Sequence, residues 1–271
     1  MATTQTAPAA DERYLAVIRS SLRICLSYKP TFGQGKGSGI NLQEFQRIYR
    51  EDEFYAWFGL DSPLVYAAHK AAGGLTSVYR QIGLGCQLVF QQVLQDTLGF
   101  TASEATWSYE VKVKGAKARS LALDGRIPLA SIKGAPLRKR VDEWLSSAAR
   151  SVGLKGKRAT SLDGCVFEVR QGYKSNDAKR QNADVSNAAN AFAHRYLPVM
   201  LLLSTQIPES LASRYQRAHW LILRGTLDGS TVDSTYAFCR DVLGYDLAGF
   251  FRRNSDAIRA ETRAVFEELL K

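Results

Sequence analysis

The chain has 271 residues, of which 45% are hydrophobic and 10% aromatic, and 36 Lys and Arg against 26 Asp and Glu give a formal net charge of +10. Burial of this much apolar surface offsets the entropy lost on folding, which excludes disorder as the main state and predicts one large domain or two small ones. No stretch approaches the roughly 18 uninterrupted apolar residues of a membrane span and the N-terminus lacks a basic, then apolar leader, so we expect a soluble, cytoplasmic protein without membrane contact.

The N-terminal quarter of the chain is predicted to be helical. After an unstructured tail over 1–10, apolar residues at helical spacing predict helices over 11–28 and 42–49, the second leading to an aromatic pair, Trp57 and Phe58. The Gly-rich segment between these helices lacks the GxxxxGK[ST] spacing of a phosphate-binding loop, so we interpret it as a connection. We expect residues 11–75 to form a helical region packed on the rest of the protein.

The periodicity then changes from helical to extended. A long amphipathic helix is predicted over 76–98, where it ends at Gly99. Polar and apolar residues alternate over 106–114 and again over 119–129, which predicts two neighbouring strands joined by the basic turn 115–118.

The remainder of the chain alternates between the two kinds of element. The pattern predicts helices over 136–152, 178–194, 209–218, 233–251 and 255–270, and strands over 164–173, 197–204 and 219–225. This order indicates an α/β (α+β) fold, a mixed central β-sheet flanked by helices. We expect an α/β core over 76–225 and C-terminal helices over 226–271.

Cysteine and histidine spacing argues against a metal site built from nitrogen or sulfur. The four cysteines are far apart in apolar segments without a CxxC pair, so we expect buried free thiols. The three histidines have no metal-ligand spacing. The positive net charge instead suggests a polyanionic partner such as nucleic acid.

Charged residues that interrupt predicted strands are the candidates for chemistry, because a central strand carries charge only where it is paired or used. Asp124 interrupts one strand beside Gly125, and Glu168 and Arg170 alternate on the strand 164–173, so these two share a face that Lys174 extends. Two carboxylates from neighbouring strands can hold a divalent cation, and a basic side chain beside them can stabilise a pentavalent phosphate.

This constellation resembles the PD-(D/E)XK nuclease superfamily over residues 76–225. The order of elements is similar, and the run YKSNDAKRQNADVSNAANAF resembles the loop and helix that follow the catalytic strand in type II restriction endonucleases. The resemblance implies a nuclease fold, Mg²⁺ as cofactor, and Asp124 and Glu168 as catalytic metal ligands. Arg170 stands where the family usually has lysine; because arginine cannot exchange a proton at ordinary pH, Lys174 is the alternative source of the catalytic positive charge.

Other acidic residues remain open as alternatives. Glu110-Val111-Lys112 is a literal ExK pattern on the first strand after the long helix, with no acidic strand before it. Asp163, at the start of the strand 164–173, is a further candidate ligand.

A polar stretch after the catalytic strand is the candidate DNA interface. Basic residues in the first turn of a helix are unfavourable against the helix dipole and invite an anion, while Arg, Asn and Gln pair with base edges and Lys and Ser with phosphates. The candidate DNA-binding residues are Lys174, Ser175, Asn176, Lys179, Arg180, Gln181 and Asn182.

The sequence therefore predicts a Mg²⁺-dependent, sequence-specific double-stranded DNA endonuclease of type II restriction character. We expect a homodimer, because a two-fold protein matches a palindromic site and cuts both strands. The rival functions are a non-catalytic DNA-binding protein with a nuclease-like fold, and a repair or RNA nuclease.

Overall fold

The computed structural model describes residues 7–32, 39–111, 119–156, 161–173 and 178–270. The described chain divides into two compact units: a sheet unit over 86–252, and a helical unit formed by residues 7–85 together with 253–270. This division differs from the boundaries expected from the sequence at 76 and 226. The reason is that one long helix contributes to both units, and the last helix packs with the first rather than with the sheet.

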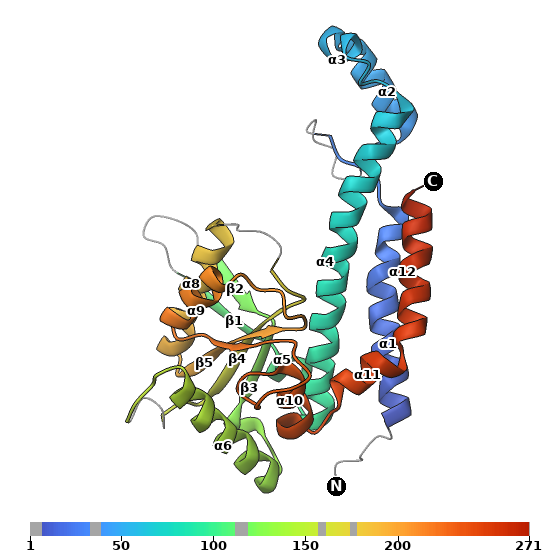
Figure 1. Ribbon diagram of the computed structural model, residues 1–271. Helices are drawn as coiled ribbons and strands as arrows, with labels where there is room; N and C mark the ends of the chain where they lie inside the picture. The colour runs from blue at the N-terminus through green and yellow to red at the C-terminus, as the bar shows by residue number, and fades with distance from the viewer. Residues whose placement is uncertain (1–6, 33–38, 112–118, 157–160, 174–177, 271) are drawn as a thin grey trace. The chain divides into compact units, whose positions relative to one another are not determined.

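The helical unit contains α1 (Ala7–Arg23), η1 (Ile24–Ser27), α2 (Leu42–Glu51), α3 (Glu53–Trp57), the first part of α4 (Pro63–Leu98) and α12 (Ser255–Leu269). The first and last helices lie side by side (Figure 1). Arg23 of α1 and Glu261 of α12 form an ion pair, with Arg23 Nε 2.6 Å from Glu261 Oε1. Arg253, the residue at which α11 (Leu247–Arg253) ends, pairs with Asp11 of α1, with Nε 2.7 Å from Oδ2. The first and last described helices thus belong to one unit.

Helix α4 begins at Pro63, thirteen residues before the start predicted from the sequence. Gly73 and Gly74 lower the helix propensity of this segment, so the sequence pattern does not indicate that the helix includes it. Because glycine has no side chain, other side chains pack directly against the helix here. A Cβ on Gly73 would lie 1.9 Å from Tyr28 Oη, and one on Gly74 would lie 2.7 Å from Leu269 Cδ2. No helix among the described residues, α4 included, is long and apolar enough to cross a membrane.

The sheet unit confirms a mixed α/β fold. Strands β1 (Trp107–Val111) and β2 (Arg119–Leu123) form an antiparallel pair, and a four-stranded sheet has the order β3 (Gly125–Pro128), β4 (Gly164–Arg170), β5 (Tyr196–Leu202), β6 (Leu221–Leu223). Strand β3 is antiparallel to β4, while β4, β5 and β6 are parallel. The helices are α5 (Ala102–Ala105), α6 (Ala135–Ser151), α8 (Ala178–Ala193), α9 (Glu209–Arg217), α10 (Thr235–Ala237) and α11 (Leu247–Arg253), with 3₁₀ and π turns at Leu129–Ser131 and Phe238–Leu243.

Both faces of the four-stranded sheet are covered. One face carries Val166 and Met200, which join a cluster with residues of β1, α8 and α9. On the other face Phe167 packs against Phe90 and Phe238, with ring centroids 5.0 and 5.7 Å apart. A charged side chain on a central strand is therefore buried, and its charge needs partners.

Several predicted elements end elsewhere in the structure. The strand predicted over 119–129 is two strands separated at Asp124, and the strand 164–173 ends at Arg170. The helix predicted over 233–251 is split by the π turn and by Gly244, whose φ of 86° ends it. Helix α1 reaches back to Ala7, inside the segment predicted as a tail, and the turn 115–118 lies outside the described residues. All four cysteines are buried and free, as expected.

Candidate acidic active site

Asp124 occupies the break between β2 and β3. Its carboxylate replaces a strand contact, because Oδ2 accepts a hydrogen bond of 2.8 Å from the backbone N–H of Val169 on β4. On the other side, Gln91 Nε2 of α4 donates to the Asp124 carbonyl oxygen at 2.6 Å. The interruption seen in the sequence therefore places a carboxylate directly beside the strand that carries Glu168 and Arg170.

Glu168 and Arg170 lie on one face of β4, as their alternation predicts. Arg170 Nη2 is 2.7 Å from Glu168 Oε1 and 3.0 Å from Asp184 Oδ1 on α8, so one guanidinium nitrogen joins two carboxylates. The Arg170 side chain is 7% exposed, and Glu168 keeps 13% exposure. Among the described residues, Arg170 Nε is buried without a hydrogen-bond partner. Arg170 is thus a buried cation held by two carboxylates.

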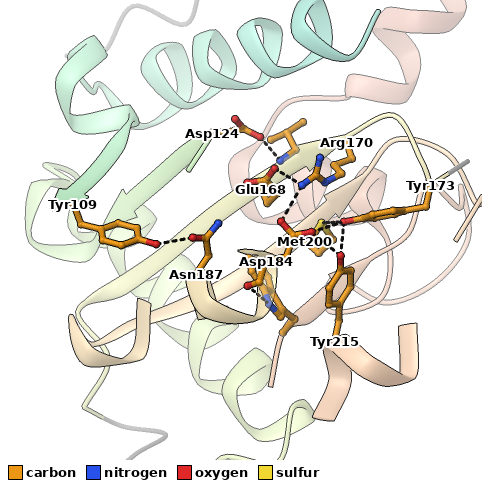
Figure 2. Close-up of polar contacts among 11 residues, drawn as sticks. Tyr109, Asp124, Glu168, Arg170, Tyr173, Asp184, Asn187, Met200 and Tyr215 are labelled. Atoms are coloured by element: carbon orange, nitrogen blue, oxygen red, sulfur yellow. Dashed lines mark hydrogen bonds and ion pairs between the residues drawn. The ribbon is translucent and has the colours of Figure 1, made fainter. Parts of the chain in front are cut away.

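Asp184 was not predicted from the sequence, yet it is the best-connected carboxylate of the site (Figure 2). Besides Arg170, it accepts hydrogen bonds from Tyr215 Oη at 2.6 Å and Tyr173 Oη at 3.3 Å, and the two hydroxyls are 3.1 Å apart. Trp220 Nε1 donates to its backbone carbonyl at 3.1 Å. Residues from β4, α8 and α9 thus converge on one buried carboxylate.

The sequence carried one signal for Asp184. It lies in an alanine-rich helix, four and seven residues before Ala188 and Ala191, both of which are buried against the sheet. An aspartate in register with the buried stripe of a helix faces the core and needs a partner there. The spacing identifies the buried face, but only the fold shows that Arg170 lies opposite.

Three carboxyl groups, those of Asp124, Glu168 and Asp184, lie near a single guanidinium, so their full ionisation would leave an excess of negative charge. Burial raises the pKa of Glu168 to about 8; Arg170 opposes this rise, while Asp124 and Asp184 add to it. Burial also raises the pKa of Asp124, against the hydrogen bond from Val169. The carboxyl groups of Asp124 and Glu168 thus resist ionisation in each other's presence, and a bound cation would stabilise their charged forms.

Asp124 and Glu168 are the two carboxylates of this group that could hold a hard divalent cation. No group of three or more His, Cys, Asp or Glu in the described part of the chain is placed to hold a metal. Mg²⁺ does not require three protein ligands, because it retains bound water and binds through one or two carboxylates together with substrate phosphate. Among the described residues, Asp124 Oδ1 and Glu168 Oε2 have no partner, which leaves one oxygen on each for that role.

The predicted DNA-binding segment is only partly visible. Lys174, Ser175 and Asn176 lie outside the described residues, and Lys179 and Arg180 are described in backbone only, within the first turn of α8. The amides that follow are described: Arg214 of α9 donates to Gln181 Oε1 at 2.7 Å and to Asn182 Oδ1 at 2.5 Å.

Arg214 therefore orients both amides. Their oxygens face the guanidinium, so their NH₂ groups remain as the donors directed elsewhere. The next residue on α9, Tyr215, donates a hydrogen bond to Asp184. Helix α9 therefore contacts both the polar start of α8 and the acidic site.

The alternative acids are not brought to this site. Glu110 is exposed on β1, while its neighbour Tyr109 is buried and donates to Asn187 Oδ1 at 2.5 Å (Figure 2); Lys112 lies outside the described residues. Asp163 pairs with Arg195 at 3.1 Å, before the start of β4, where it is half-exposed. The structure thus groups Asp124 with Glu168 and Arg170, and adds Asp184.

Comparison of the chain with protein-family models, curated proteins and solved structures finds no match.

Proposed function

We propose that this protein is a divalent-metal-dependent endonuclease that hydrolyses phosphodiester bonds in double-stranded DNA. The observation that carries the proposal is the largely buried group formed by Asp124, Glu168 and Arg170. The Asp124 carboxylate, at a strand break, accepts a hydrogen bond from the neighbouring strand, on which Glu168 and Arg170 form an ion pair. The order of elements supports it: the long helix α4, the antiparallel pair β1–β2, strand β3, helix α6, strand β4, then helix α8 and the parallel strand β5. The resemblance implies a helix, a hairpin with an aspartate, a strand with glutamate and a basic residue, and then a helix and a further strand.

Asp124 and Glu168 are the residues that would hold Mg²⁺, and the bound ion would polarise the phosphate and lower the pKa of water for the attack. Arg170 acts through charge alone. Its guanidinium cannot exchange a proton, but it is fixed by Glu168 and Asp184, and a preorganised cation stabilises developing negative charge without reorganisation. The pairing of Asp184 with Arg170 makes it a positioning residue in this scheme.

The substrate proposal depends on charge and on the start of α8. A formal net charge of +10 favours a polyanion, and the oriented amides of Gln181 and Asn182 offer hydrogen-bond donors of the kind that contact base edges or phosphates. Sequence-specific cleavage by a homodimer, as in type II restriction enzymes, is the proposed form of the activity.

Plasmid digestion tests the proposal. The purified chain is incubated with supercoiled plasmid and, separately, with structured RNA, each with Mg²⁺ or with EDTA. We expect discrete DNA fragments only in the presence of Mg²⁺, and intact RNA. Digestion of RNA or random DNA smearing would assign a repair or RNA nuclease instead, and undiminished cutting in EDTA would contradict the metal requirement.

A non-catalytic DNA-binding protein is the second candidate, and one observation favours it. Arg170 forms an ion pair with Glu168 Oε1, and the Val169 N–H donates to Asp124 Oδ2. One of the two carboxylate oxygens of each acid is therefore already occupied by a contact within the protein. Retention of plasmid on a native gel without cleavage at any Mg²⁺ or Mn²⁺ concentration would select this candidate.

A further inference from the structure

Asp184 differs from Asp124 and Glu168 in how its carboxylate oxygens are used. Its Oδ1 accepts from Arg170 Nη2 at 3.0 Å and its Oδ2 from Tyr215 Oη at 2.6 Å, so protein donors occupy both oxygens (Figure 2). The contacts of the described residues engage one oxygen each on Asp124 and Glu168. Asp184 is also more deeply buried than Glu168, with 4% of its side chain exposed against 13%. It is therefore placed as a partner of Arg170 rather than as a ligand for a cation.

A pair of tyrosines, Tyr173 and Tyr215, lies behind this carboxylate. Tyr173 Oη is 3.3 Å from Asp184 Oδ2 and 3.1 Å from Tyr215 Oη, so both hydroxyls lie within hydrogen-bond distance of one oxygen. Burial raises the pKa of both tyrosines, and each hydroxyl therefore keeps its proton and remains a donor. Hydrogen bonds to a carboxylate are among the strongest in proteins. The tyrosine pair thus fixes the orientation of Asp184 toward Arg170.

The contact between Arg170 and Glu168 limits what Glu168 can bind. Arg170 Nη2 lies 2.7 Å from Glu168 Oε1 as well as 3.0 Å from Asp184 Oδ1, so two carboxylates share one cation. Because a buried charge without a counterion is costly, an Arg170 that lost its contact with Asp184 would be neutralised by Glu168 alone. A divalent cation would then compete with the guanidinium for the same carboxylate. With Asp184 in place, the charge of Glu168 is available to a cation.

We infer that Tyr215 is a positioning residue for metal binding: through Asp184 it keeps Arg170 neutralised, so that Glu168 remains available to a divalent cation. The inference rests on the proposed function, because the cation is the proposed Mg²⁺, and it adds the residues that support the metal ligands. Removal of a group behind a metal ligand commonly lowers metal affinity about 10- to 100-fold. Tyr215 carries no charge, so the loss of its hydroxyl would act on the metal only through the position of Asp184.

Mn²⁺ binding to the full chain without DNA, followed at pH 8 by the electron paramagnetic resonance signal of the free ion, tests the inference. We expect Tyr215→Phe to weaken Mn²⁺ binding about tenfold, the lower end of the range for supporting groups, because one hydroxyl and no charge is removed. Tyr236→Phe, in the same unit, is the matched control. The Tyr236 hydroxyl donates to the Leu203 carbonyl at 2.8 Å rather than to a carboxylate, and its loss should leave the Mn²⁺ affinity unchanged.

Equal Mn²⁺ affinities for Tyr215→Phe and the wild type, or an equal loss in Tyr236→Phe, overturn the inference and leave the proposed function standing. Circular dichroism checks the fold of each variant. If Tyr215→Phe does not fold, Tyr173→Phe replaces it, with a smaller loss expected because its hydrogen bond to Asp184 is longer, at 3.3 Å.

Asp124→Asn shows whether the bound Mn²⁺ lies in the proposed site, because it removes one of the two proposed ligands and should abolish the binding. Binding that persists in Asp124→Asn, or that is absent from the wild type, contradicts the metal site of the proposed function and overturns the inference with it.

Discussion

Replacement of Glu168 by Gln is expected to stabilise the metal-free protein at alkaline pH. The Glu168 carboxyl is buried among Asp124 and Asp184, and its pKa is raised to about 8 from an ordinary value near 4.5. Gln keeps the size of the side chain and an oxygen that accepts from Arg170 Nη2, and it cannot ionise. The variant therefore retains the hydrogen bond without the cost of a buried charge.

The sign follows from proton linkage. Because the folded pKa of Glu168 lies above the unfolded one, the folded state binds more protons between pH 4.5 and 8. The stability that this group contributes is therefore fully present below pH 4.5 and is lost as pH rises to 8. A shift of this size corresponds to about 3 kcal/mol lost between pH 5 and pH 8. The side chain is 13% exposed, so solvent screening removes little of this effect.

Urea unfolding followed by tryptophan fluorescence, at pH 5 and pH 8 in EDTA, measures the effect. We expect equal stabilities at pH 5 and a Glu168→Gln variant that is more stable than the wild type by about 3 kcal/mol at pH 8. Glu110→Gln, an exposed substitution on β1, is the control and should follow the wild type at both pH values. A Glu168→Gln variant as pH-sensitive as the wild type would refute the electrostatic account of this site.

Three further substitutions test the contacts around the site. Asp184→Ala should cost about 3 kcal/mol in urea unfolding, because Arg170 loses one of its two carboxylates; a cost below about 0.5 kcal/mol would contradict its supporting role. Arg170→Ala should slow plasmid cleavage about 100-fold while Arg170→Lys keeps part of the rate, and equal rates for wild type and Arg170→Ala would remove the guanidinium from catalysis. Arg214→Ala should release the amides of Gln181 and Asn182 and reduce the affinity for the cleaved sequence by about 1–3 kcal/mol relative to unrelated duplex, whereas equal losses for both duplexes would exclude a role in specificity.

The local part of the site could be predicted from the sequence because it depends on the period of a strand. Glu168 and Arg170 are two residues apart, and a strand places such residues on one face in any fold. Asp124 was found in the same way, as a charge that interrupts an alternating pattern. These inferences require no knowledge of which strand lies beside which.

The rest of the site could not be predicted because it depends on tertiary contacts between elements that are distant in the sequence. Asp184 reaches Arg170 only because α8 crosses back over β4 to begin the parallel strand β5, and Tyr215 joins it from a third element. The start of α4 was missed for a related reason: Gly73 and Gly74 weaken helix propensity locally, and their advantage, close packing of Tyr28 and Leu269, is visible only in the fold.

The most direct test of the proposed function is the cleavage rate of supercoiled plasmid at saturating Mg²⁺ by the wild type and by Asp124→Asn. Thermal melting of both proteins serves as the check on folding, and Asp163→Asn serves as the matched acid outside the site. The account predicts discrete fragments from the wild type and from Asp163→Asn, and a loss of at least about 100-fold for a folded Asp124→Asn protein, because one of two metal ligands is removed. Cleavage by Asp124→Asn at the wild-type rate would contradict the assignment of this acidic group as the active site.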